Sequence, residues 1–205
     1  MNTEQQQRNP VLLVHGINDT GAVFKKMAFY LRQRGWSVYT LDLLPNNGSE
    51  VLDKLAQQVA NYVAATFAPE QPLDLLGFSM GGIVSRYYIQ RLGGIDRIQR
   101  FITISSPHQG TMMAYGSWLH GCVQMRPKSS FLQNLNSDIE MLKKLNFTSI
   151  WTPYDLMIVP AKSSQISLGK EVILPVAFHP WMLTDHRTLA IVAETLVEPI
   201  NCILG

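Results

Sequence analysis

The sequence has little charge and little cysteine. Charged residues make up 16% of its 205 positions, and the formal net charge at pH 7 is only +2. Because there is also no cluster of lysine or arginine, this balance argues against a nucleic-acid partner, although a weakly positive protein can still touch an anionic membrane surface. The two cysteines, Cys122 and Cys202, could form a single disulfide, but buried free thiols are the more common state in a chain of this length.

Targeting and metal-binding signals are also missing. No apolar run approaches the roughly 18 residues that a membrane-spanning helix needs, and the polar residues 1–7 lack the apolar core of a secretory signal. These absences predict a cytoplasmic protein that could lie peripherally on a membrane. The sequence contains neither Cys-x-x-Cys nor His-Glu-x-x-His spacing, so we expect no metal and no other cofactor.

Hydrophobic residues, in contrast, make up 46% of the chain and gather in short runs that alternate with helical patterns. This alternation predicts an α/β fold in which a mostly parallel sheet of about six strands carries helices on both faces. The predicted strands cover residues 11–14, 36–41, 73–78, 101–105, 149–152 and 172–174. The predicted helices cover 19–34, 50–67 with Ser49 as its cap, 80–92, 130–145 and 188–197. No linker or repeat divides the chain, so we expect a disordered tail over residues 1–9 and one domain over 10–205.

A Gly-x-Ser-x-Gly pattern, from Gly77 to Gly81, joins the strand predicted over 73–78 to the helix that follows it. This is the spacing of a nucleophile elbow, in which glycines allow a backbone turn too tight for side chains and Ser79 is pushed out toward a substrate. The start of the helix adds amide donors and a positive dipole end where an oxyanion could form. The pattern alone arises by chance in loops, but its place between strand and helix is typical of a serine hydrolase.

Two further motifs accompany the elbow: Val14-His15-Gly16-Ile17 before it and Ser106-Pro107-His108-Gln109-Gly110-Thr111 after it. Together with the run from Gly77 to Tyr87, they resemble the α/β-hydrolase superfamily, and within it the small bacterial lipases and esterases that have a minimal lid or none. The resemblance extends over residues 10–200. It implies a triad in the chain order Ser, Asp or Glu, His. One departure is Phe78, where many relatives have histidine.

The acid of this triad must follow Ser79. The segment Tyr154-Asp155-Leu156-Met157-Ile158-Val159-Pro160 lies just past a predicted strand and resembles the Asp-x-x-Val-Pro loop of the family, which assigns the acid to Asp155. A carboxylate at this position could reach a histidine in the next loop and fix its tautomer. The alternative is that Asp155 only caps a turn.

Two of the five histidines, His179 and His186, can supply the base. His186 follows Asp185, which is well placed as the N-cap of the closing helix, so His186 falls in the first helical turn. His179 lies on the loop after the last predicted strand, where the resemblance implies the base. We therefore prefer His179 and keep His186 as the runner-up, while His15 and His108 are expected to brace loops.

An oxyanion hole needs backbone N–H groups directed at the point where negative charge grows. Met80, the residue after the nucleophile, supplies one donor, and the resemblance assigns the other to Ile17. Residues 111–147 form an excursion beside the expected site. Its apolar side chains either line an acyl-chain pocket or simply pack over the edge of the sheet. They include Met112, Met113, Trp118, Leu119, Met125, Phe131 and Leu132.

The sequence therefore predicts a carboxylic-ester hydrolase of lipase or esterase type, with an acyl ester or lipid as its substrate. Ser79 attacks the ester carbonyl and forms an acyl-enzyme, and His179, held by Asp155, moves the proton. Two alternatives stay open. One is acyl transfer or thioester hydrolysis with the same triad; the other is a non-catalytic binding module on the same fold, which would not need an intact triad.

Overall fold

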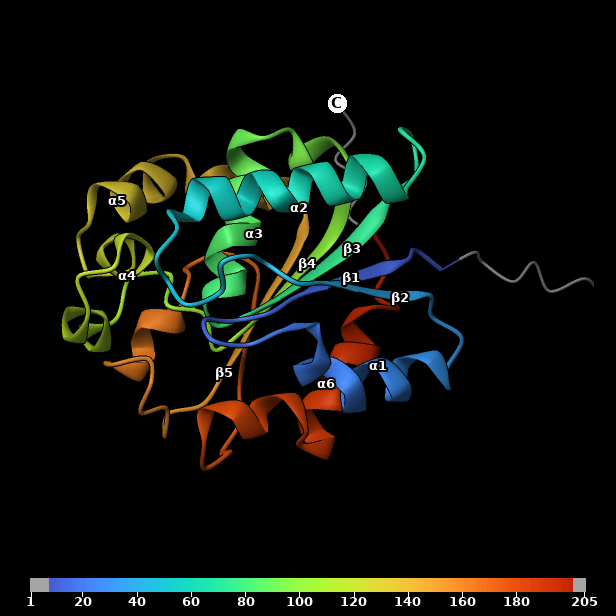
Figure 1. The fold of residues 1–205 in the computed structure, drawn as a ribbon. Helices are drawn as coiled ribbons and strands as arrows, with labels where there is room; N and C mark the ends of the chain where they lie inside the picture. The colour runs from blue at the N-terminus through green and yellow to red at the C-terminus, as the bar shows by residue number, and fades with distance from the viewer. Residues whose placement is uncertain (1–7, 201–205) are drawn as a thin grey trace, which may run out of the picture.

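The sheet has six strands, all parallel, in the order β2-β1-β3-β4-β5-β6 (Figure 1). The computed structural model describes residues 8–200. Its strands are β1 (Val11–Val14), β2 (Val38–Leu41), β3 (Leu73–Phe78), β4 (Ile98–Ile104), β5 (Asn146–Trp151) and β6 (Lys170–Ile173). In the central pairs, Val14 lies opposite Leu41 on one side and Gly77 on the other. The predicted α/β fold with a sheet of about six strands is confirmed.

Helices cover both faces of the sheet (Figure 1). One face carries α1 (Lys25–Arg32) and α6 (His186–Thr195), and the other carries α2 (Leu52–Thr66) and α3 (Met80–Arg91). Alternate side chains of β1 supply both cores: Leu12 and Val14 pack with α2 and α3, while Val11 and Leu13 pack with α1 and α6. A strand buried on both faces must be apolar at nearly every position, which explains the unbroken apolar runs in the sequence.

A buried ion pair lies at the amino edge of the sheet. Arg100 of β4 contacts Asp74 of β3 at 3.1 Å, and the side chain of Asn9 donates to Asp74 at 3.0 Å. Burial raises the pKa of the Asp74 carboxyl, and Asn9 and Arg100 oppose that rise. Residues 1–7 of the predicted tail lie outside the described residues, whereas Asn9, also predicted to be part of the tail, is held by its hydrogen bond to Asp74.

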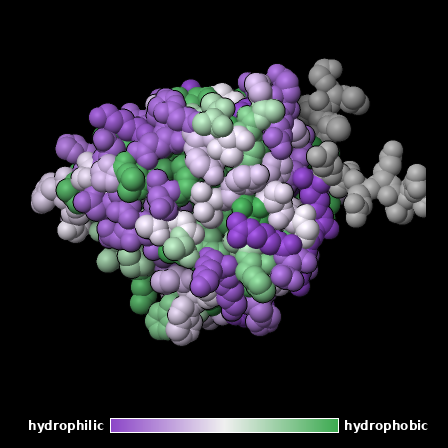
Figure 2. All heavy atoms as spheres, turned by 45° about the vertical axis from the view of Figure 1, so that its right-hand side comes forward, coloured by the Kyte–Doolittle hydropathy of each residue, from purple (hydrophilic) through white to green (hydrophobic). Residues whose placement is uncertain are grey.

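Figure 2 turns this side of the molecule forward and shows hydrophilic and hydrophobic side chains interspersed on the visible face.

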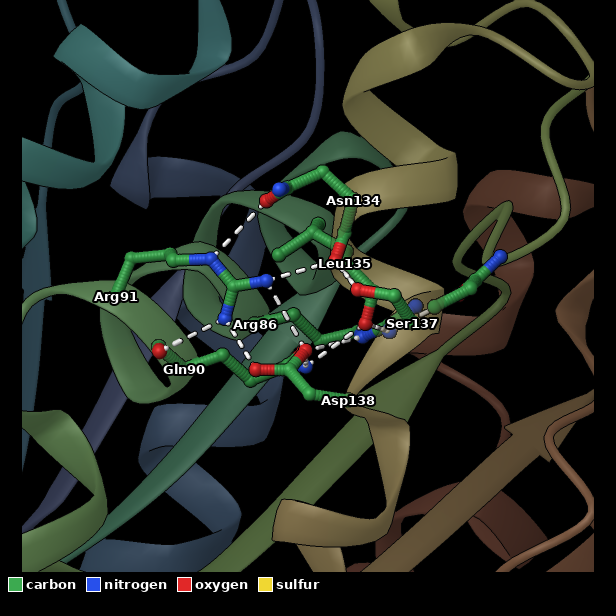
Figure 3. Close-up of polar contacts among 8 residues, drawn as sticks. Arg86, Gln90, Arg91, Asn134, Leu135, Ser137 and Asp138 are labelled. Atoms are coloured by element: carbon green, nitrogen blue, oxygen red, sulfur yellow. Dashed lines mark hydrogen bonds and ion pairs between the residues drawn. The ribbon is translucent and has the colours of Figure 1, made fainter.

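The excursion over residues 111–147 contains η3 (Met112–Gly116), α4 (His120–Gln124), α5 (Ser130–Ser137) and η4 (Ile139–Lys144). The prediction of one continuous helix over 130–145 is wrong, because the chain leaves helical geometry at Asp138, where φ is −125° and ψ is 31°. The Asp138 carboxylate there accepts hydrogen bonds from Arg91 at 2.6 Å and from Gln90 at 2.9 Å (Figure 3). These tertiary contacts outweigh the local helical preference.

Two helix starts also differ from the prediction. The helix α2 begins at Leu52 with Val51 as its N-cap, and Ser49 instead bonds to the side chain of Asn47 at 2.6 Å. The segment predicted as one helix over 19–34 opens with a 3-10 turn, η1 (Gly21–Phe24), before α1 begins. Within residues 8–200, no helix is both long and apolar enough to cross a bilayer.

The structure describes one of the two cysteines, which were expected to be buried free thiols. Cys122 is buried in α4 and has no disulfide partner among residues 8–200. Cys202 lies outside the described residues.

Candidate active site

Ser79 lies at the junction of β3 and α3 on a strained backbone. Its φ of 53° and ψ of −124° fall in a region that residues with a Cβ rarely adopt. The turn is tight: a methyl group at Gly81 would collide with the carbonyl of Val14, and one at Gly77 would collide with the backbone of Gly82. The backbone therefore has the elbow geometry that the sequence predicts.

His179 and Asp155 form a buried hydrogen-bonded pair. The Nδ1 atom of His179 lies 2.7 Å from Oδ2 of Asp155, and the two residues are only 7% and 5% exposed. Oδ1 accepts the N–H groups of Met157 and Ile158, each at 2.9 Å. Burial works against ionisation of Asp155, but the hydrogen bond and charge of His179, together with the two amides, hold the pKa of its carboxyl below the usual value. Because an ionised carboxylate only accepts hydrogen bonds, Nδ1 carries the proton and Nε2 is free to accept one.

The loops that carry this pair meet the elbow at one edge of the sheet. Asp155 follows β5, and His179 opens the 3-10 helix η6 (His179–Leu183) after β6. In a parallel sheet the carboxyl ends of all strands lie at the same edge, where α/β proteins bind their ligands. The ring of His179 lies 4.7 Å from that of Phe78, centroid to centroid, and Phe78 directly precedes Ser79. The three residues predicted as a triad are therefore gathered at the carboxyl edge.

His186, the runner-up base, has different surroundings. It is the first residue of α6, directly after the N-cap Asp185, whose carboxylate accepts the N–H of Arg187 at 2.9 Å. The Arg187 side chain also pairs with Asp185 at 2.9 Å and lowers the pKa of that carboxyl to about 2. Asp185 is therefore occupied as a helix cap, as the sequence predicts, and Arg187 rather than His186 is its partner.

The loop after β1 is held in place by His15. Its Nδ1 donates to the carbonyl of Gly16 at 2.8 Å, and its Nε2 accepts the N–H of Leu43 at 2.8 Å. The buried ring thereby ties this loop to the segment after β2. Among the described residues, the N–H of Ile17 has no hydrogen-bond acceptor, and that of Met80, the first residue of α3, has none within its helix. The two predicted oxyanion donors are thus unpaired.

Asp19 is a further charged group at this edge, and no motif in the sequence identifies it. A methyl group on Gly16 would lie 2.9 Å from Cβ of Ser79 and 3.4 Å from Oδ2 of Asp19, so the nucleophile and this carboxylate flank the same glycine. Burial raises the pKa of Asp19, and the nearby His15 and His179 oppose that rise. Its position depends on the folded loop, which explains why sequence patterns miss it.

A buried polar cluster fastens the excursion to α3 (Figure 3). Arg86 donates to the carbonyl of Leu135 at 2.9 Å and to Oδ1 of Asn136 at 3.0 Å, both on α5. Gln90 donates to the same Leu135 carbonyl at 2.8 Å. Burial lowers the pKa of Arg86 to about 9, so its guanidinium stays charged at neutral pH. In the sequence Arg86 is only one more residue of the helix after the elbow.

The apolar side chains of the excursion fall into two sets. Met125 and Leu132 are buried in the core beside α2 and α3, and Phe131 stacks on Tyr87 with 5.5 Å between ring centroids. Met112, Met113, Trp118 and Leu119 are exposed. Packing over the sheet edge accounts for the first set, whereas the second set faces outward.

In the part of the chain that the structure describes, the remaining polar groups form no second cluster of this kind. His108 is fully buried with Nε2 3.0 Å from Oγ1 of Thr103, and burial, aided by the charge of Arg86, lowers its pKa well below the usual value. Among residues 8–200, no group of three or more His, Cys, Asp or Glu side chains is arranged to hold a metal ion. A cavity of about 990 Å³ opens at the amino edge, beside Arg34 and Arg100, away from Ser79.

Solved structures of lipases share this fold. Aspergillus fumigatus lipase B superposes with a TM-score of 0.78 at 19% identity, over 96% of this chain and 54% of that one. The mature form of Bacillus licheniformis lipase BlEst2 superposes with a TM-score of 0.70 at 16% identity, over 94% of this chain and 93% of that one. At these identities the likeness shows the fold, which is that of the α/β-hydrolases, as the motifs predict.

Curated proteins that are similar to this chain in sequence are named as thioesterases. Lysosomal thioesterase PPT2 of Bos taurus is 33% identical over 107 residues, and that of Homo sapiens is 32% identical over 108. Each match covers 49% of this chain and 34% of the relative, so the chain spans about a third of the length of the curated relatives it matches. Because these relatives are named as lysosomal, the prediction of a cytoplasmic protein is wrong.

A family match covers the first part of the fold. The sequence model of the palmitoyl protein thioesterase family matches residues 10–137, which is more than half of the chain. The match includes Ser79, Met80 and Ile17 and ends before Asp155 and His179, whose pairing rests on geometry alone. The expected relationship to ester hydrolases is confirmed, and this chain belongs to the palmitoyl protein thioesterase family.

Proposed function

We propose that this protein hydrolyses carboxylic esters or thioesters of apolar acyl groups through an acyl-enzyme on Ser79. The observation that carries the proposal is the 2.7 Å hydrogen bond between His179 and Asp155 beside the strained serine. A serine needs a base to remove its proton, and that base needs a fixed tautomer. Family membership supports the same chemistry.

The first half-reaction forms the acyl-enzyme. Oγ of Ser79 attacks the carbonyl carbon while Nε2 of His179 takes its proton, and Asp155 stabilises the imidazolium that results. The oxygen of the tetrahedral intermediate carries the negative charge and accepts the N–H groups of Met80 and Ile17. When the intermediate collapses, the alcohol or thiol leaves with the proton from His179.

The second half-reaction returns the free enzyme. Water attacks the acyl-enzyme carbonyl as His179 takes a proton from it, and the same two amides hold the oxyanion. Collapse of this intermediate releases the carboxylic acid and returns the proton to Ser79. Every proton passes through His179, so no metal or redox cofactor enters the scheme.

A thioester substrate is favoured over an oxygen ester by the family match, which covers the nucleophile and the oxyanion loop. The exposed apolar side chains of the excursion, such as Met112 and Met113, support an apolar acyl group because they stand at the same edge of the sheet as Ser79. Acyl transfer uses the same first half-reaction and differs only in the acceptor.

The test compares oxygen esters and thioesters that carry the same acyl group. p-Nitrophenyl esters and S-acyl thiocholines from short to long acyl chains should both be cleaved by the full chain, with the higher kcat/KM for the thioester. A fluorophosphonate should label Ser79, as read by mass spectrometry. Ser79→Ala should stay folded and lose about 10⁴-fold or more in turnover. A folded Ser79→Ala that keeps a tenth of the activity would contradict the mechanism, and a wild-type protein that neither turns over nor is labelled would favour the binding module.

A further inference from the structure

Exposed apolar side chains are concentrated in one stretch of the excursion, residues 112–123. We call this the excursion face and define it by six residues: Met112, Met113, Tyr115, Trp118, Leu119 and Val123. Trp118 is 83% exposed, and the others are between 37% and 53% exposed. Large apolar side chains grouped in this way on a water-soluble surface mark a site of interaction.

The excursion face is continuous with the loop that carries Asp155. The N–H of Met112 donates to the carbonyl of Val159 at 2.8 Å, and the hydroxyl of Thr111 donates to the carbonyl of Met157 at 2.9 Å. In that loop, Leu156 and Met157 are also exposed. The apolar surface therefore reaches from the excursion to the edge of the candidate active site.

The segment that carries these side chains has positive charge and no negative charge. The sequence contains no Asp or Glu from residue 97 to residue 137. The guanidinium of Arg126 lies 4.8 Å from the ring centroid of Tyr115 and 4.7 Å from that of Trp118. Among residues 8–200, neither Arg126 nor Lys128 takes part in an ion pair. Arg126 donates to the carbonyl of Ser117 at 2.9 Å, but within these residues no carboxylate balances the charge of either cation.

We propose that the excursion face docks on an anionic lipid surface. Tryptophan and tyrosine favour the boundary between headgroups and acyl chains, because one end of each ring system is apolar and the other is polar. Arg126 beside them, and Lys128 two residues further along the chain, meet the negative potential of anionic lipids. A protein partner with an uncharged apolar patch would leave both cations without a counter-ion, whereas an anionic lipid surface supplies one, so the charge favours lipid. Docking would turn the carboxyl edge, with Ser79, toward the membrane.

Vesicle sedimentation tests the proposal without relying on ester chemistry. The full chain should pellet with vesicles of phosphatidylcholine and phosphatidylserine and bind at least several-fold more weakly to phosphatidylcholine alone. Raising the salt concentration should weaken the binding, because the attraction of the cations is screened. Trp118→Ser should raise the Kd about tenfold, since it removes the largest exposed apolar group.

Matched variants distinguish binding through the excursion face from non-specific binding through any exposed apolar side chain. Phe29→Ser removes an apolar side chain that is 64% exposed on α1, on the opposite face of the sheet, and should leave binding unchanged. Lys128→Gln should remove part of the preference for phosphatidylserine. Circular dichroism and thermal melting show that each variant is folded.

Three outcomes would overturn docking on lipid. The wild-type protein could fail to pellet with either vesicle, or Trp118→Ser and Phe29→Ser could weaken binding equally. Light scattering could instead reveal a dimer that Trp118→Ser dissociates, with no vesicle binding; the excursion face would then be an interface between two copies. None of these outcomes bears on hydrolysis, so the failure of docking and the failure of the proposed function can be told apart.

Discussion

The carboxylate of Asp155 accepts three hydrogen bonds, and one of them, at 2.7 Å, comes from Nδ1 of His179, whose ring lies 4.7 Å from that of Phe78 beside the elbow. The two amide bonds from Met157 and Ile158 fix the carboxylate, and the carboxylate fixes the imidazole. The orientation of the base is therefore set by backbone atoms of the loop after β5, which are rigid compared with a free side chain.

Asp155→Asn should abolish most activity without unfolding the protein. The amide cannot ionise, so it neither fixes the proton on Nδ1 of His179 nor stabilises the imidazolium, and we expect kcat to fall on the order of 10⁴-fold. Steady-state kinetics on a short-chain thioester measure the loss. Asp185→Asn, which changes the carboxylate that caps α6, is the matched control. It should keep near wild-type activity, because asparagine caps a helix about as well as aspartate, and lose only the exposed ion pair with Arg187. Equal activity of the two variants would remove Asp155 from the mechanism.

Replacing His179 and His186 by alanine, one at a time, distinguishes their roles. His179→Ala should be as inactive as Ser79→Ala, because no other described histidine is hydrogen-bonded to a carboxylate at the carboxyl edge. His186→Ala should keep most activity, since His186 only begins α6. The two purified variants are assayed side by side on one ester after their folding has been checked. An active His179→Ala together with an inactive His186→Ala would reverse the assignment.

The tight turn at the elbow makes a prediction about stability. Gly81→Ala would drive a methyl group into the carbonyl of Val14, and we expect a loss of about 3 kcal/mol in the free energy of unfolding. Gly116→Ala is the matched control, because no atom lies within 4 Å of the added methyl group there; its effect should stay within about 0.5 kcal/mol. Urea denaturation measures both values. Similar losses in the two variants would mean that the elbow can relax.

We expect replacement of Asp19 to raise the stability of the fold by an amount that depends on pH. Burial raises the folded pKa of Asp19 above the unfolded value of 3.8, although the neighbouring His15 and His179 oppose that rise. An acid with a raised pKa costs stability once it must ionise, so the cost appears as pH rises through the window between the two pKa values and is constant above it. Asp19→Asn should therefore raise Tm at pH 7, and the gain should vanish toward the lower end of that window.

Thermal melts of both proteins across pH measure this difference, and Asp53→Asn on α2 is a control in which the gain should be absent. A Tm gain for Asp19→Asn that is the same at every pH would show that ionisation is not its cause.

The features predictable from the sequence are those with a local cause. Apolar runs identify β1 and β3 because both faces of these strands are buried, and the Asp185 cap is visible because it depends on its immediate neighbours. That Ser79, Asp155 and His179 lie together can be predicted from the rule that the carboxyl ends of parallel strands lie at one edge of the sheet. The fold and the candidate triad therefore follow from short-range patterns and one topological rule.

Most of the features that the sequence does not reveal have a tertiary cause. The helix predicted over 130–145 breaks at Asp138 because Arg91 and Gln90, which lie in α3, bind its carboxylate. Ser49 turns to Asn47 instead of capping α2. Asp19 reaches the elbow through the path of its loop. At Asp138 residues distant in sequence decide the outcome, and at Asp19 the course of the loop does. At Ser49 a neighbouring side chain, two residues away, competes with the predicted cap.

The order of the strands along the chain determines when each residue of the candidate site is synthesised. Ile17, Ser79 and Met80 belong to the part of the chain that is made first, with β1, β2 and β3, whereas Asp155 and His179 follow β5 and β6 at the other end of the sheet. On the proposed mechanism, a nascent chain carries its nucleophile without a base and cannot acylate itself on stray esters. Turnover then begins only when the last strand has docked, so activity reports that the whole sheet is complete.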